Sequence, residues 1–195
     1  DLLLVGLDGT ETVGFLYRNL GQGTFKFRRV FTDIDGYMGG FADLDNDGDL
    51  DLVFAGDDLA YLNDGTGRFS RGPAIPVGGI DDPRAIAFAD IDADGDLDFA
   101  IGAKRSANRL IRNDKDSGNW LKIKLRSAQG QAGAFGAKVR VLGTGNTLLG
   151  FRESRSNNGY LGQDDPILHV GLGSETSVTV EVTFLDGTIR TLTEV

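Results

Sequence analysis

An aspartate-rich phrase occurs twice in this 195-residue sequence. Residues 41–56 read FADLDNDGDLDLVFAG, and residues 88–103 read FADIDADGDLDFAIGA. Like charges this close repel one another, so a fold that keeps them beside an apolar run needs a compensating positive charge. The ten aspartates are Asp43, Asp45, Asp47, Asp49 and Asp51 in the first copy and Asp90, Asp92, Asp94, Asp96 and Asp98 in the second.

Other phrases show that each aspartate phrase belongs to a longer repeat, which is best sought before anything else. LYRNLGQGTF at 16–25 matches AYLNDGTGRF at 60–69, with a weaker echo in LIRND at 110–114. DLLLVG, which opens the sequence, matches the runs that close the two aspartate phrases. The sequence therefore holds three copies, and Asp1 corresponds to the last acid of the first copy, which lacks the rest of the aspartate phrase.

The repeats have the pattern of β-strands. Short β-rich runs end in glycine, and LAYLN and RLIRN alternate apolar with polar residues, as half-buried strands do. The glycines of LGQG and DGTG suit the positive φ angles of hairpin turns. Repeats of about 40–50 residues with about four strands each are typical of β-propeller blades. Fewer than three blades cannot close a ring, so we expect blades encoded upstream, or else a neighbouring chain, to complete it.

The pattern changes near residue 117. Six apolar-polar alternating segments follow, beginning with GNWLKIKLRS at 118–127 and ending with the hairpin signal LDGT at 185–188. We therefore predict an all-β protein: a partial β-propeller over residues 1–117 and a small β-sandwich-like domain over residues 118–195.

The spacing of the aspartates predicts a loop that wraps around one hard cation. Acids at loop positions 1, 3, 5 and 9 can turn inward, position 7 can offer its carbonyl, and glycine at position 6 allows the sharp bend. Calcium accepts six to eight oxygens at flexible angles, whereas magnesium demands a stricter octahedron. An EF-hand is excluded because position 12 is Phe54 or Ile101 instead of glutamate. Two solvated acidic turns without metal are the alternative.

The two aspartate phrases resemble FG-GAP (also called VCBS) repeats, the calcium-loop blades of integrin α-subunit propellers and of many bacterial exported proteins. The resemblance covers about residues 1–116 and implies two Ca²⁺ sites. It places the family's carboxylate ligands on Asp43, Asp45, Asp47 and Asp51, and on Asp90, Asp92, Asp94 and Asp98. Asp49 and Asp96 fall where the family uses a backbone oxygen.

Residues 118–195 resemble the ASPIC/UnbV domain, which follows such repeats in the cartilage acidic protein family and in many bacterial proteins. The resemblance implies a fold and a setting more than an activity. The residues at motif positions are Trp120, Gly136, Tyr160, Gly162, Asp165, Pro166, His169, Gly171 and Gly173.

Composition and motifs argue against several classes of protein. The net charge of −9 disfavours nucleic acid as a partner, and no apolar run approaches the roughly 20 residues of a membrane span. Cysteine is absent, which excludes disulfides and thiolate metal sites. The P-loop, Rossmann and nucleophile-elbow patterns are absent too. His169, the single histidine, is better explained as a structural residue than as a general base, so we expect no enzyme activity.

Two features could contact a ligand, although each has a simpler explanation. The polar stretch 150–165 could bind a sugar or a partner loop, but a solvated connection is the simpler interpretation. Trp120, the single tryptophan, could stack on a sugar, but a role at the domain junction is favoured.

Together these inferences predict a calcium-stabilised, non-catalytic, extracytoplasmic module for adhesion or scaffolding, which binds a protein or a glycan and forms the C-terminal part of a larger repeat protein. The location (secreted, cell surface or periplasmic) follows from the family resemblance. The alternative is an accessory domain or subunit of a polysaccharide-acting enzyme, or of a large protein assembly.

Overall fold

The computed structural model describes residues 1–195 except 33, 116–117, 128–129, 131–132, 158 and 160. Among the described residues it contains strands and one 3₁₀ turn, Thr144–Asn146, which confirms the predicted all-β class. The first ten strands are β1 (Leu2–Asp8), β2 (Glu11–Asn19), β3 (Phe25–Phe31), β4 (Gly39–Ala42), β5 (Asp51–Phe54), β6 (Leu59–Asn63), β7 (Phe69–Ala74), β8 (Pro83–Ala89), β9 (Asp98–Ala103) and β10 (Arg109–Ile111).

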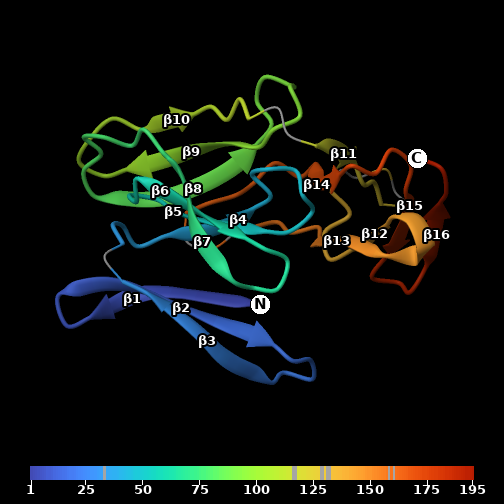
Figure 1. The fold of residues 1–195 in the computed structure, drawn as a ribbon, viewed down its shortest axis with the longest axis horizontal. Helices are drawn as coiled ribbons and strands as arrows, with labels where there is room; N and C mark the ends of the chain where they lie inside the picture. Colours follow the sequence, from blue (N-terminus) through green and yellow to red (C-terminus); the bar gives the residue numbers. More distant parts are fainter. Residues whose placement is uncertain (33, 116–117, 128–129, 131–132, 158, 160) are drawn as a thin grey trace.

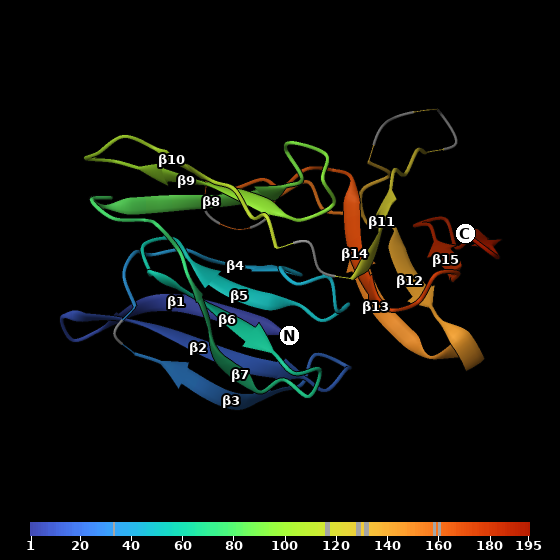
Figure 2. The ribbon, with the colours of Figure 1, turned by 45° about the horizontal axis from the view of Figure 1, so that its top comes forward.

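These strands form three antiparallel sheets, β1-β2-β3, β4-β5-β6-β7 and β10-β9-β8, which stack face to face like successive blades of a propeller (Figures 1 and 2). Because strand side chains alternate between faces, β5 contributes side chains to the apolar cores on both sides of its sheet. Leu52 and Phe54 enter the apolar core shared with the first sheet, and Val53 enters the core shared with the third. The partial-propeller prediction is confirmed.

The blades differ from the expectation of about four strands each, because only the middle sheet has four among the described residues. Strands β4 and β8 run into the two aspartate phrases and had not been predicted. GGFA is too short to show a period, and PRAIAFA shows no regular alternation of apolar and polar residues. The third sheet ends at β10 because the chain then leaves for the second unit.

Within the described residues the second unit has six strands, as predicted, arranged as two sheets, β11-β14 and β13-β12-β15-β16. Val139 and Val141 of one sheet and Val170 and Leu172 of the other share one apolar core, which gives the sandwich-like packing. The predicted boundary at 117/118 falls beside residues outside the described part of the chain. The strands are β11 (Asn119–Ile123), β12 (Lys138–Leu142), β13 (Leu148–Glu153), β14 (Leu168–Gly173), β15 (Thr179–Thr183) and β16 (Ile189–Leu192).

The second unit lies at one end of the three stacked sheets (Figure 2). Strands β13 and β14 are close to the end of β4 (Figure 1), which is where the first aspartate phrase begins. The fold thus brings the C-terminal unit against the aspartate loops.

Candidate metal centres

Each aspartate phrase forms a loop that joins two paired strands. Residues 43–50 connect β4 to β5, where Ala42 faces Asp51, and residues 90–97 connect β8 to β9, where Ala89 faces Asp98. The glycine at position 6 has a φ of 97° in the first loop (Gly48) and 101° in the second, a conformation that L residues with a Cβ rarely adopt. The repeated sequence therefore folds into the same turn twice, and the predicted role of this glycine is confirmed.

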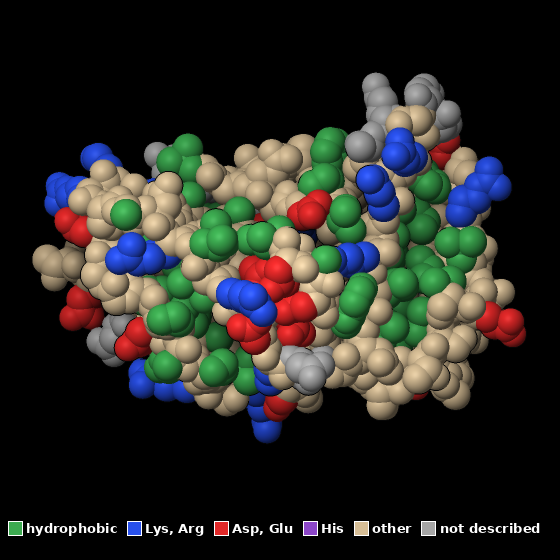
Figure 3. Space-filling model, turned by 90° about the horizontal axis from the view of Figure 1, so that it is seen from above, with side chains coloured by type: hydrophobic (Ala, Val, Ile, Leu, Met, Phe, Trp, Pro, Cys, Tyr) green, Lys and Arg blue, Asp and Glu red, His purple; other side chains and the backbone are tan. Residues whose placement is uncertain are grey.

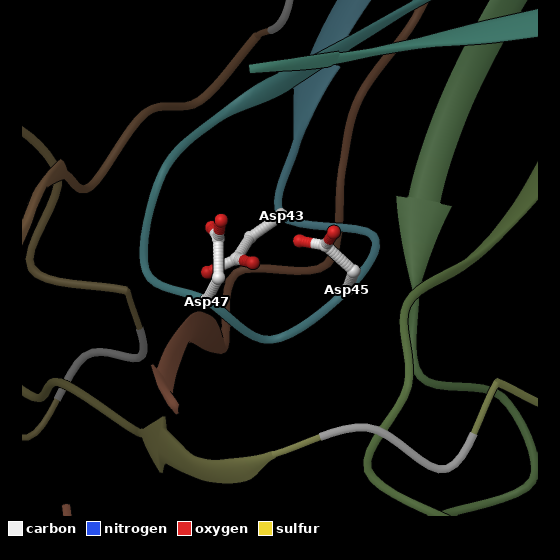
Figure 4. A group of neighbouring side chains, drawn as sticks. All are labelled: Asp43, Asp45 and Asp47. Atoms are coloured by element: carbon white, nitrogen blue, oxygen red, sulfur yellow. The ribbon is translucent and has the colours of Figure 1, made fainter. Parts of the chain in front are cut away.

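The first three acids of each loop converge. One carboxylate oxygen from each of Asp43, Asp45 and Asp47 lies within 4.8 Å of the others (Figure 4), and Asp90, Asp92 and Asp94 form an equivalent group in the second loop. Acidic side chains also gather near the middle of one face of the molecule, beside Lys and Arg side chains (Figure 3). Carboxylates held this close can bind a metal ion between them.

In both loops the aspartate at position 1 is held by one backbone N–H and one basic side chain, although the N–H comes from strand β14 in the first loop and from the loop itself in the second. The side chain of Asp43 is fully buried; its Oδ2 accepts hydrogen bonds from Gly171 N at 2.8 Å and Arg152 Nη2 at 3.2 Å. In the second loop, Asp90 Oδ2 accepts from Gly95 N at 3.0 Å and forms an ion pair with Lys122 Nζ. In both residues the other oxygen, Oδ1, is buried without a hydrogen-bond partner in the structure.

A buried carboxylate oxygen without a hydrogen-bond partner is unfavourable, so these two Oδ1 atoms are suited to bind a cation. Burial raises the pKa of Asp43 to about 6, against the opposing effect of Arg152. Burial also raises the pKa of Asp47, which is more exposed than Asp43. The negative charge of nearby Asp45 raises this pKa further. The donor set is all oxygen, which suits a hard ion such as calcium.

The acid at position 9 has a different environment in both loops. Asp51 accepts the backbone N–H of Leu44 at 2.9 Å through Oδ2 and that of Asn63 at 2.8 Å through Oδ1. Asp98 repeats this arrangement with Ile91 and Asn113, both at 2.9 Å. These two aspartates therefore close the loop and tie it to the next strand, and they lie outside the convergent groups.

Burial raises the pKa of Asp51 to about 7, although its two backbone hydrogen bonds act in the opposite direction. The ionised form of this side chain is therefore costly in the ion-free protein. A nearby divalent cation would stabilise that charge.

The acids at position 7 also lie outside the convergent groups. The backbone N–H of Asp49 donates to Asp47 Oδ1 at 2.9 Å, and that of Asp96 donates to Asp94 Oδ1 at 3.0 Å. These bonds fix the direction of the position-5 carboxylate in each loop. The side chain of Asp96 is buried and accepts a hydrogen bond from Asn46 Nδ2 at 2.7 Å.

The second unit contacts both loops through the strand pair β11–β14. His169, opposite Lys122 in the pair, is buried, and its Nε2 lies 2.8 Å from the carbonyl oxygen of Gly95. The Trp120 indole stacks on the His169 ring, with centroids 6.3 Å apart, and lies so close to Gly95 that a Cβ there would overlap it. Burial lowers the pKa of His169, so its imidazole is neutral. Trp120 is thus confirmed as a junction residue.

Among the described residues, four basic side chains pair with acids of the convergent groups, and the sequence did not reveal them as partners: Arg152 with Asp43, Lys115 with Asp45, Lys122 with Asp90 and Arg112 with Asp92. Arg152 had been noted only as part of the polar stretch 150–165, and Lys122 as part of a strand. Each contacts an acid from a distant part of the chain, and no local period signals such a pairing.

Two described segments of the polar stretch 150–165 are tied to strands. Residues 150–153 belong to β13. Farther on, Phe88 N donates to Asp164 Oδ1 at 2.9 Å and Asp165 N donates to the Phe88 carbonyl at 3.0 Å, so the chain lies along β8. This stretch lines a cavity of about 790 Å³ together with β1 and β4. Tyr160, a predicted motif residue, lies outside the described residues.

In the described part of the chain, no helix has the length and apolar character needed to cross a membrane.

Two protein families match parts of this chain. Residues 43–101 match the FG-GAP-like repeat, and residues 127–195 match the ASPIC and UnbV family. Two segments of the chain thus match these two families, which confirms the resemblances that the sequence had indicated.

Three named proteins are similar to part of this chain. The chain is 41% identical over 75 residues to "Cartilage acidic protein 1" of Mus musculus and 40% identical over 75 residues to that of Homo sapiens. It is 41% identical over 73 residues to the Xenopus tropicalis protein. The aligned segments cover 37–38% of this chain and 11% of these relatives, so the chain spans only a small part of their length.

Proposed function

We propose that the chain is a calcium-stabilised, non-catalytic interaction module of an extracytoplasmic protein, with one Ca²⁺ in each aspartate loop. The observation that carries the proposal is the pair of buried Oδ1 atoms of Asp43 and Asp90, which lack hydrogen-bond partners within groups of convergent carboxylates. Asp45 and Asp47 in the first loop, and Asp92 and Asp94 in the second, would supply the other side-chain ligands.

A bound cation would add positive charge between the convergent carboxylates, beyond the basic side chains that already pair with some of them. The residues of the chain provide the framework: Asp51 and Asp98 close the loops, and Arg152 and Lys122 orient the position-1 acids. Modules of extracellular proteins bind calcium with Kd values on the order of 10⁻⁴–10⁻³ M. The location follows the FG-GAP-like repeat and the cartilage acidic protein relatives.

Adhesion or scaffolding is the role that such a module would serve, with a protein or a glycan as partner. The stacked blades and the docked second unit provide a rigid surface once the loops are ordered. The cavity of about 790 Å³ beside the loops would contribute contacts to a partner.

Calcium titration tests the metal assignment. Isothermal titration of chelator-treated protein should show two bound ions, and calcium should raise the melting temperature by several degrees, because a ligand that binds only the folded state stabilises it. A melting curve that ignores both calcium and chelator would contradict the proposal.

A glycan array combined with a turnover assay on polysaccharides tests the non-catalytic role. Binding without turnover supports an interaction module. Turnover that is lost in His169→Ala but kept in Arg140→Met, a change remote from the loops, would favour the enzyme-accessory alternative.

A further inference from the structure

The two aspartate loops touch one another through the buried side chain of Asn46. Asn46, at position 4 of the first loop, is 1% exposed. Its Nδ2 donates to Asp96 Oδ1 at 2.7 Å and to the Gly95 carbonyl at 3.3 Å, both in the second loop. Asn46 lies between two members of the first convergent group, and its acceptors directly follow Asp94, a member of the second. One residue thus connects the two candidate sites.

The second loop shows that the turn itself does not require asparagine. Ala93 is the residue at position 4 there, with a φ of 64° against 57° for Asn46, and its side chain is exposed. Both are non-glycine residues in the left-handed region, and the same turn forms with alanine. The asparagine amide is therefore explained by the contact between the loops and not by the local conformation.

Strand β14 supports both loops at once. Gly171 N donates to Asp43, and Gly173 N donates to the Asn46 carbonyl at 2.8 Å, which fixes the first loop. His169, two residues before Gly171, contacts the Gly95 carbonyl of the second loop. Gly171 packs so tightly that a Cβ there would lie 2.3 Å from the backbone carbon of Asn46. A rigid strand therefore limits how far either loop moves without the other.

We propose that the two loops bind their cations as a coupled pair, with Asn46 as the positioning residue and β14 as the shared support. The inference rests on the proposed function, because it presupposes that both loops bind a cation. An ion in the first loop would order residues 45–47 and thereby fix the Asn46 amide, which holds Gly95 and Asp96. The second loop would then lose less conformational freedom when it binds its own ion, which is positive cooperativity.

Terbium luminescence provides a readout that is local to the second loop. Tb³⁺ is a hard, oxygen-preferring cation, and energy transfer from an excited indole to Tb³⁺ falls steeply with distance. Trp120 is the only tryptophan and packs directly on Gly95 of the second loop. Terbium emission excited through tryptophan therefore reports binding there, and its loss in Asp94→Ala would assign the signal to that loop.

The decisive variant is Asn46→Ala, with Ala93→Asn as the matched control at the equivalent position. We expect Asn46→Ala to weaken Tb³⁺ binding at the second loop about fivefold or more, the lower range of typical coupling between sites, and Ala93→Asn to leave it unchanged. Asp47→Ala, which retains Asn46 but removes a ligand of the first loop, should weaken the second loop as well. If Asn46→Ala does not fold, Asp47→Ala still tests the coupling between the two loops.

The outcomes separate the coupling from ion binding itself. If the second loop of Asp47→Ala binds Tb³⁺ with wild-type affinity, the coupling is refuted, whatever Asn46→Ala does, and the two sites are independent. If Asn46→Ala folds and keeps wild-type affinity, Asn46 does not position the loops. A wild-type protein with neither terbium emission nor calcium-dependent melting would instead overturn the proposed function.

Discussion

Replacing Arg152 with methionine should destabilise the ion-free protein far more than the calcium-loaded protein. Arg152 has a side chain that is only 12% exposed and faces the fully buried Asp43. Its Nε donates to the His169 carbonyl at 3.0 Å, and Nη2, which pairs with Asp43, also donates to the Gly48 carbonyl at 3.4 Å. Methionine keeps most of the apolar volume of the stem but leaves the Asp43 carboxylate with Gly171 N as its remaining hydrogen-bond donor in the structure.

The magnitude follows from the cost of an uncompensated buried charge. Breaking a buried ion pair by removing one partner costs about 3–5 kcal/mol, and the 3.2 Å contact places this pair near the lower value. For a chain of about 200 residues, each kcal/mol shifts the melting temperature by roughly 2–4 °C. We therefore expect a loss of roughly 6–12 °C in chelator. In calcium the loss should be smaller, because the cation stabilises the Asp43 charge.

Thermal unfolding followed by circular dichroism, in EGTA and in millimolar calcium, measures both quantities. Arg140→Met is the matched control, because Arg140 pairs with Glu181 at 2.8 Å on the surface of the same unit, where a salt bridge contributes about 1 kcal/mol or less. Equal losses for Arg152→Met and Arg140→Met in chelator would refute the assigned role. So would a loss for Arg152→Met that calcium does not reduce.

Three further predictions follow from the same geometry. In chelator the protein should be more stable near pH 5 than near pH 7.5. Folding raises the pKa of Asp43 to about 6 and that of Asp51 to about 7. Protonation of these two side chains therefore favours the folded state, and this stabilisation is lost as the pH rises through the two values. The increase in melting temperature caused by calcium should accordingly be larger at pH 7.5, and an increase that is larger at pH 5 would contradict this assignment. Asp47→Ala should lower calcium affinity and the calcium-induced shift more than Asp49→Ala does, as titration calorimetry can measure; equal losses would mean that the Asp49 side chain is itself a ligand. Gly171→Ala should lower the free energy of unfolding by about 1–3 kcal/mol, because the added Cβ overpacks against the first loop; urea unfolding measures this loss. Gly6→Ala is the control and should cost less, because the space around an added Cβ is open there.

Much of the fold is encoded in local patterns that a single sequence displays. The aspartate spacing and the glycine at position 6 predict the loop, because a turn is set by the residues within it. The alternation in LAYLN and RLIRN predicts β6 and β10 for the same reason. Strands β4 and β8 escaped prediction because each is identified mainly by its partner, β5 or β9, and not by its own period.

The candidate sites were predictable only in part, because part of their surroundings comes from a distant segment. The convergence of Asp43, Asp45 and Asp47 follows from local spacing. The contact of Arg152 with Asp43 joins residues 109 positions apart, and the contact of Asn46 with Asp96 depends on how two blades stack. Such pairings are determined by tertiary packing, which no local pattern reports.

The contact between the last acid of each motif and an asparagine occurs in all three repeats. Asn19 N donates to Asp1 Oδ1 at 2.9 Å, just as Asn63 donates to Asp51 and Asn113 to Asp98. The final aspartate of each repeat thus ties its own strand to the strand that follows it. Because the donor is a backbone N–H, which every residue except proline carries, blades of this kind should preserve the final aspartate even where the other acids of the motif have been replaced.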